Sequence, residues 1–122
     1  MKRKNAFINA ANGIGLCIRQ EVNFRIQLIA ALTAISLGFF FNVNVTEWLF
    51  IIGCCMLVLS LELLNTALEN ICDIVSKDFD PLIKIVKDTA AGAVFLSAAG
   101  SAVMGAVIFL PKIIHQIKLL TT

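Results

Sequence analysis

The sequence carries little charge for its length. Of its 122 residues only 15% are Asp, Glu, Lys or Arg, whereas 59% are hydrophobic, and the mean hydropathy is +0.91. An average soluble domain has about 25% charged residues. The composition therefore excludes an ordinary soluble globule and predicts a single small membrane-embedded domain over residues 1–122.

Several motifs that would assign a function directly are also missing. There is no GxxxxGK[ST] loop and no protein-kinase signature. The first apolar run begins too late for a cleavable signal peptide, and nothing predicts a nucleic-acid partner. The four cysteines match no CxxC or Cys/His metal spacing, so we expect no disulfide framework but small apolar side chains, with the adjacent Cys54 and Cys55 on different helix faces.

Long uncharged runs are what the sequence has in abundance. They predict membrane-spanning helices at about residues 26–45, 48–68 and 90–110, each long enough for a hydrocarbon core of about 30 Å. We expect the third span to stop at Pro111. Before the first span, about residues 3–20 place apolar side chains on one helical stripe, which predicts an amphipathic helix on the membrane surface. The predicted fold is thus an all-α membrane protein.

Small residues follow one another at every fourth position in the third span, at Ala93, Ser97, Ser101 and Gly105. Such a stripe allows helices to approach closely in lipid. Its simplest interpretation is helix packing.

The basic residues predict the orientation in the membrane. Five precede the first span and none lies in the turn at 42–47. Three lie in segment 70–89, which we expect to be a sizeable polar loop between the second and third spans. The positive-inside rule then places the N-terminus and segment 70–89 in the cytoplasm. Lys112 and Lys118, near the C-terminus, oppose this orientation only mildly. Pro81 fits a turn or the first turn of a new helix within that segment.

The most informative stretch is LELLNTALENICD, residues 61–73, at the end of the second span. Its polar residues share one narrow helical stripe, since they are three, four and four positions apart: Glu62, Asn65, Glu69 and Asp73. A carboxylate in hydrocarbon is costly unless a metal, water, a partner charge or a substrate compensates it. This stripe therefore predicts a functional site at the cytoplasmic membrane boundary.

Phosphoryl transfer is one chemistry that these residues would serve. Glu69 and Glu21 offer hard oxygen ligands for Mg²⁺ that also carries phosphate. Glu62, one layer deeper, could accept a proton from a lipid hydroxyl, and Lys87 could meet phosphate oxygens. A small oligomeric proton-coupled transporter using Glu62 is the alternative, and a purely structural role is a third. The residues alone thus indicate a membrane enzyme or a transporter.

Two long motifs carry a resemblance to a known family. ELLNTALENICD and the later KDTAAGAV match the pattern E-x-x-N-[ST]-A-[IL]-E-x-x-x-D and K-D-x-[AG]-[AS]-[AG]-[AS]-V of the bacterial integral-membrane diacylglycerol kinase and undecaprenol kinase family. EVNFR, from Glu21 to Arg25, resembles the family's entry to the first span. The similarity covers nearly the whole chain.

The resemblance implies a function and a role for each matching residue. The chain would be an ATP-dependent lipid kinase of the bacterial cytoplasmic membrane, a homotrimer with three spans and a surface helix per subunit and with active sites shared between neighbours. Its implied site residues are Glu62 as general base with Asn65 beside it, Glu21 and Glu69 as ligands of the ion bound to ATP, Lys87 and Asp88 as nucleotide contacts, and Asp73 and Arg25 as supporting residues.

Some positions depart from the family pattern. Asn9 stands where an aromatic residue is common, which argues against stacking on adenine there, and Asp80, Val86 and Gln27 also differ. None of these belongs to the implied catalytic set. The acceptor lipid, diacylglycerol or undecaprenol, stays open, as do the number of metal ions and the role of the C-terminal tail.

Overall fold

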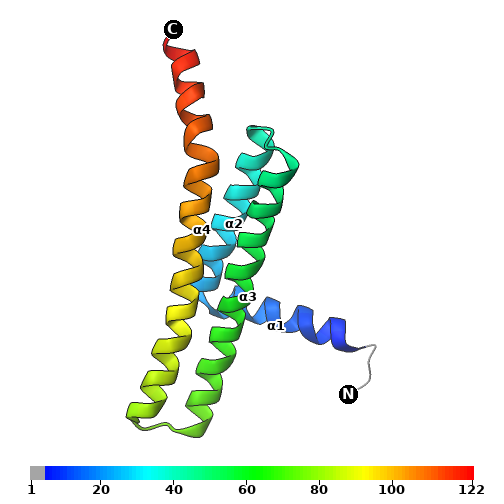
Figure 1. Cartoon of the computed structure of the whole chain (residues 1–122). Coiled ribbons are helices and arrows are strands. Elements are labelled where there is room, and N and C mark those ends of the chain that lie inside the picture. The colour runs from blue at the N-terminus through cyan, green and yellow to red at the C-terminus, as the bar shows by residue number, and fades with distance from the viewer. Residues whose placement is uncertain (1–4) are drawn as a thin grey trace.

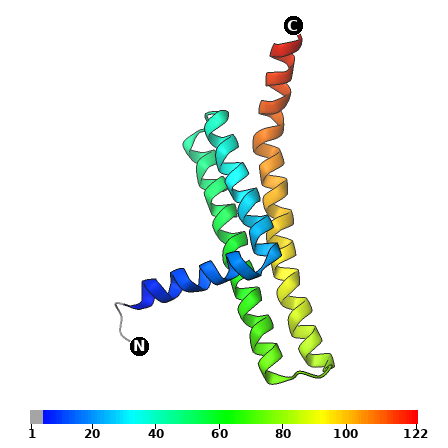
Figure 2. The same cartoon turned by 180° about the vertical axis from the view of Figure 1, so that it is seen from behind.

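The computed structural model describes residues 5–122 and consists there of four α-helices without strands. They are α1 (Ala6–Gln20), α2 (Val22–Phe40), α3 (Val45–Val75) and α4 (Pro81–Thr121). Figures 1 and 2 show α2, α3 and α4 side by side, while α1 leaves the bundle sideways from the start of α2. The predicted all-α fold with a separate N-terminal helix is confirmed.

Glu21 separates α1 from α2. Its backbone is extended (φ −105°, ψ 111°), so the chain changes direction at this one residue. The Glu21 N–H still donates to the Cys17 carbonyl at 2.9 Å. Arg25, one turn into α2, donates to the carbonyl oxygens of Ile18 at 3.0 Å and Arg19 at 2.9 Å. Arg25 therefore satisfies carbonyls at the end of α1, which the helix itself leaves without donors.

A tight turn joins α2 to α3. Asn42 adopts the left-handed conformation (φ 50°) that asparagine tolerates better than most residues. Asn44 then caps α3: its side chain accepts from the Glu47 N–H at 2.8 Å, and the Glu47 carboxylate accepts from the Asn44 N–H at 3.1 Å. This reciprocal pair is a capping box, which fixes the start of the helix.

The connection between α3 and α4 is shorter than the sequence analysis indicated. Segment 70–89 was predicted to be a sizeable polar loop, but α3 continues to Val75 and α4 already begins at Pro81. Pro81 takes the first helical position, and the Asp80 side chain accepts from the Leu82 N–H at 2.9 Å. Proline is suited to this position because its fixed φ matches a helix and its missing N–H is not needed there.

The prediction that the third span stops at Pro111 was wrong. Helix α4 runs through Pro111 to Thr121. An interior proline removes one backbone hydrogen bond and often kinks a helix, but it need not end one. Just after Pro111, Lys112 forms an ion pair with Glu47 at 2.8 Å, and this contact joins α4 to the start of α3.

The interior of the bundle is small and the exterior is strongly apolar. Val43, Ile51 and Phe109 form a buried cluster near the α2–α3 turn. Large hydrophobic side chains are exposed along all four helices. Within residues 5–122, α2, α3 and α4 are each long and apolar enough to cross a membrane. The predicted number of membrane-spanning helices is therefore confirmed, and the chain is a multi-pass membrane protein.

The cysteines behave as predicted. All four are free. Cys54 lies 3.3 Å from the Met104 sulfur on α4, whereas Cys55 points to the Ala31 carbonyl on α2. The two neighbours thus face different helices.

Candidate functional site

The contacts between α3 and α4 fix how the two helices align. Three pairs lie along their length: Glu47 with Lys112, Cys54 with Met104, and Asp73 with Lys87. The helices are antiparallel, and the three pairs agree in register to within one residue. In the same way, the contact of Cys55 with Ala31 places Glu21, at the start of α2, at the level of Asn65 on α3.

Glu62 lies inside the bundle although it carries a carboxylate. Only 5% of its surface is exposed. It continues the buried stripe of Ile51 and Val58, which lie eleven and four positions earlier on α3. The carboxylates of Glu69 and Glu21 are near enough to repel it electrostatically. Three acidic groups from α3 and the α1–α2 junction therefore gather in one region.

Asn65 stands between two of these acids on α3. Its Nδ2 donates to Glu69 Oε1 at 3.2 Å. Its other amide atom, Oδ1, is buried and has no hydrogen-bond partner in the described chain. Buried polar atoms normally have a partner, because burying them unpaired costs free energy. This oxygen is thus available to a hydrogen-bond donor or a cation supplied from outside.

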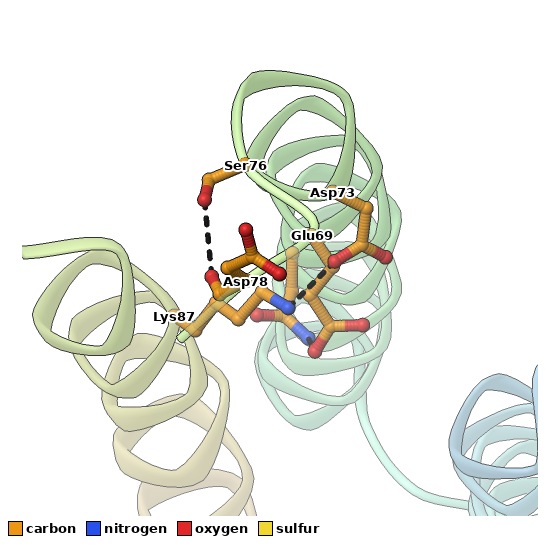
Figure 3. A network of polar contacts seen from close by, with 6 residues as sticks. Glu69, Asp73, Ser76, Asp78 and Lys87 are labelled. Atoms are coloured by element: carbon orange, nitrogen blue, oxygen red, sulfur yellow. Dashed lines mark hydrogen bonds and ion pairs between the residues drawn. The ribbon is translucent and has the colours of Figure 1, made fainter. Parts of the chain in front are cut away.

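Two ion pairs lie at the loop end of the site. Lys87 of α4 binds Asp73 of α3 at 2.7 Å, and Lys84 binds Asp88 one turn along α4 at 2.5 Å. Figure 3 shows the Lys87 ammonium reaching across to Asp73 beside Glu69. The proximity of Glu69 also favours the charged ammonium electrostatically. Lys87 therefore joins α4 to the acidic stripe.

A polar pocket of about 650 Å³ opens beside these ion pairs. Sequence reasoning missed part of its lining, namely Ser76, Lys77, Asp78 and Lys84. Ser76 Oγ donates to the Asp78 carbonyl at 3.0 Å, as Figure 3 shows, and this bond shapes the connection. Lys84 and Asp88, four apart on a helix, could have been recognised as an i,i+4 pair from the sequence.

The predicted site residues thus fall into one continuous region with one exception. Glu62, Asn65, Glu69 and Asp73 share a face of α3, Glu21 approaches it from the α1–α2 junction, and Lys87 approaches from α4. Asp88 lies at the rim of the pocket, paired with Lys84. Arg25 instead binds the end of α1, so its contribution is to the position of α1 and not to the acidic region.

The acidic region has the ligand chemistry of a hard cation. Carboxylate and amide oxygens, which Glu69, Glu21 and Asn65 provide, are the donors that Mg²⁺ prefers. Within residues 5–122, however, no three His, Cys, Asp or Glu side chains are grouped closely enough to hold an ion. A magnesium ion would therefore need phosphate oxygens or water for its remaining ligands, which is how it is usually held with a nucleotide.

Comparison with known proteins gives a consistent result. The family model described as prokaryotic diacylglycerol kinase matches residues 8–109. A protein of Bacillus subtilis named undecaprenol kinase is 40% identical over 108 residues, which is 88% of each chain. A diacylglycerol kinase of Synechocystis is 37% identical over 92% of this chain and 70% of its own.

A diacylglycerol kinase of Pseudomonas aeruginosa is 34% identical over 80% of each chain. The matched region begins within α1 and ends two residues before Pro111. It includes every predicted site residue and both motifs named above. The fold, the acidic face of α3 and these matches together lead to one conclusion: the chain belongs to the prokaryotic diacylglycerol kinase family.

Proposed function

We propose that this lipid kinase transfers the γ-phosphoryl group of ATP to the hydroxyl of a membrane lipid alcohol at the cytoplasmic face of the membrane. The observation that carries the site assignment is the burial of Glu62 with two further carboxylates nearby. The family supports phosphoryl transfer, and nothing in the comparisons supports the transporter alternative.

In this proposal Glu62 is the base. It accepts the proton of the lipid hydroxyl while that oxygen forms a bond to the γ-phosphorus, and the bond from the γ-phosphorus to the bridging oxygen of ADP breaks. Phosphoryl transfer depends mainly on positioning and electrostatic stabilisation, so few further groups are needed. Glu62 suits the task because it lies about two turns deeper on α3 than Glu69, where an alcohol can arrive from the bilayer.

The nucleotide would lie on the other side of Glu62, toward the connection between α3 and α4. Lys87 would bind phosphate oxygens, and Asp88 the nucleoside end, beside the polar pocket. Glu69 and Glu21 would hold a magnesium ion shared with the phosphates, with Asn65 beside it. When bound, this ion would neutralise charge that develops on the phosphates.

The proposed orientation puts α1 on the cytoplasmic surface of the membrane. Figures 1 and 2 support it, since α3 and α4 extend past the junction of α1 and α2 toward the polar connection. If α1 lies on the surface, the ends of α3 and α4 project into water and Glu62 stays just inside. The basic residues Lys2, Arg3 and Lys4, on which the orientation also depends, lie outside the described residues.

We further propose that the working protein is a homotrimer whose subunits complete one another's sites. The apolar exterior of the bundle is compatible with contacts between copies as well as with lipid. The acceptor is either diacylglycerol or undecaprenol, since the relatives include kinases named for each.

A direct assay tests the function. Purified protein in mixed micelles receives ATP and Mg²⁺ together with diacylglycerol or undecaprenol, and phosphate transfer to each lipid is measured. We expect transfer to at least one of them. Glu47→Gln serves as a control, because Glu47 lies at the opposite end of α3. Absence of transfer to both lipids, with ATP-independent ion flux in vesicles, would instead support the transporter.

A further inference from the structure

Ser97 of α4 is the other buried polar side chain in the part of the chain that the structure describes. Its exposed fraction is 9%, and that of Glu62 is 5%. In the sequence, Ser97 belongs to a stripe of small residues suited to helix packing. At Gly105, in the same stripe, an added Cβ would meet nothing within 4 Å. Close packing against another helix of this chain therefore does not explain the small residue at that position.

The register of α3 and α4 places Ser97 at the same level of the bundle as Glu62. The pairs Cys54 with Met104 and Asp73 with Lys87 lie on either side of this level. Because the helices are antiparallel, each step forward on α3 corresponds to one step back on α4. Counted from either pair, residue 97 lies opposite residue 62 to within one position. Ser97 is two turns before Met104, so it lies on the face of α4 that meets α3.

The hydroxyl of Ser97 has a free acceptor site. Its proton is donated to the Val94 carbonyl at 2.8 Å. A serine hydroxyl that donates in this way keeps lone pairs that can accept a hydrogen bond. Glu62, at the same level, forms no hydrogen bond or ion pair within residues 5–122, although it is more than nine-tenths buried. Two buried polar groups at one level of the bundle thus have lone pairs that residues 5–122 leave unused.

An apolar groove leads to Ser97. It has a volume of about 520 Å³, lies between α3 and α4, and includes Leu61, Ala93 and Ser97 at its end nearest the acidic region. Apart from Ser101, the rest of its lining is apolar up to Leu49, near the far end of α3. A molecule that fits it would have a hydrocarbon body and a hydroxyl at one end.

We propose that Ser97 binds the hydroxyl of the lipid alcohol and so positions it for Glu62. This inference rests on the proposed function and extends it, since it assigns a lipid-positioning residue that the motifs do not include. Ser97 would accept a hydrogen bond from the hydroxyl before transfer, and Glu62 would then take the proton.

Ser36 of α2 provides a matched control for the test. Its hydroxyl also donates to a carbonyl of its own helix, that of Leu32 at 2.8 Å, but it does not line the groove. Ser97→Ala, Ser97→Cys and Ser36→Ala are compared in the mixed-micelle assay, with the lipid and ATP varied separately. Cys keeps the shape of Ser but is a poor acceptor, and Ser97→Thr restores the hydroxyl.

We expect Ser97→Ala and Ser97→Cys to raise the KM for the lipid alcohol about threefold to tenfold, the effect of losing one hydrogen bond. The KM for ATP should not change, and Ser97→Thr and Ser36→Ala should resemble the wild type. A wild-type lipid KM in both the Ala and Cys variants would overturn the inference, as would an equal effect of Ser36→Ala. If the wild type phosphorylates no lipid, the proposed function itself fails, which is a different result.

Discussion

At the scale of single residues, the carboxylates of α3 differ in how far they are buried. Glu62 is buried, whereas Asp73 is exposed and paired with Lys87. A helical stripe of acids predicts that they share a face, but it does not predict which of them is enclosed. Burial depends on where α2 and α4 cover α3, and this follows from the packing of three helices together.

Replacing Glu62 by Gln should remove the base without changing its size. We expect kcat to fall by about 10² to 10⁴-fold, the usual contribution of a general base. The oligomer should stay assembled, since Gln avoids burying an unpaired charge. Phosphate transfer and size-exclusion chromatography in detergent measure the two effects. Full activity of Glu62→Gln would contradict the assignment.

Replacing Lys87 by Gln should weaken the binding of ATP. We expect the KM for ATP to rise about tenfold or more, since a charge-assisted contact to phosphate is lost, while the KM for the lipid is unchanged. Lys84→Gln is the control: it removes the same charge from the same pocket, but Lys84 is paired with Asp88 and not with the acidic face of α3. Equal effects of the two substitutions would show that only the total charge matters.

At the scale of helices, the α2–α3 hairpin is held by a close contact that the sequence does not reveal. A Cβ added at Gly38 would lie 2.6 Å from the Trp48 ring. Trp48 also packs against Phe39 at a centroid distance of 4.8 Å. Because Trp48 follows the polar turn at 42–47, the sequence predicts a tryptophan at the membrane interface. Only the structure shows that glycine is needed opposite its ring.

Gly38→Val should therefore destabilise the hairpin. Overpacking typically costs about 1 to 3 kcal/mol, so we expect a lower midpoint of unfolding in denaturant. Trp48→Leu in the same chain should restore part of the loss. Gly53→Val is the matched control, because an added Cβ there meets nothing within 4 Å. An equal shift for Gly53→Val would mean that the loss comes from placing a β-branched residue in a helix, and not from the contact with Trp48.

The ion pair between Glu47 and Lys112 joins α4 to the start of α3. Both side chains are largely covered, with 20% and 28% exposed. Glu47→Gln keeps the capping box, since Gln can serve in it, but loses the charge. We expect Glu47→Gln and Lys112→Gln each to lower the midpoint of unfolding in denaturant, and the double variant to lower it little further. Additive losses in denaturant unfolding would show that the pair is not coupled.

At the scale of the whole molecule, the sequence correctly predicted the fold class and the number of spanning helices. It also singled out the acidic stripe of α3, whose role stays a prediction. Uncharged runs of about 20 residues and the motifs on α3 and α4 carry this information. The helix ends were less well predicted. The polar residues of segment 70–89 predicted a loop, but α3 and α4 extend beyond the apolar runs. Polar residues can continue a helix where two helices contact each other, as α3 and α4 do through the ion pair of Asp73 with Lys87.

The assembly also belongs to this scale. We expect native mass spectrometry in detergent to give a mass of three chains of 13.3 kDa. Because few side chains of this bundle are buried, contacts with neighbouring copies in a trimer would stabilise its folded state. Dilution to a monomer that remains fully active would contradict the trimer and the sharing of sites.

The extended backbone at Glu21 has a consequence for how the kinase responds to its surroundings. In the proposed orientation, the backbone of Glu21 is the joint between a helix that lies at the level of the head groups and a helix that crosses the bilayer. Any change in curvature or lateral pressure that lifts or sinks α1 will tilt that joint. Turnover should thus vary with the shape of the host lipids, even when the acceptor and its concentration are held constant.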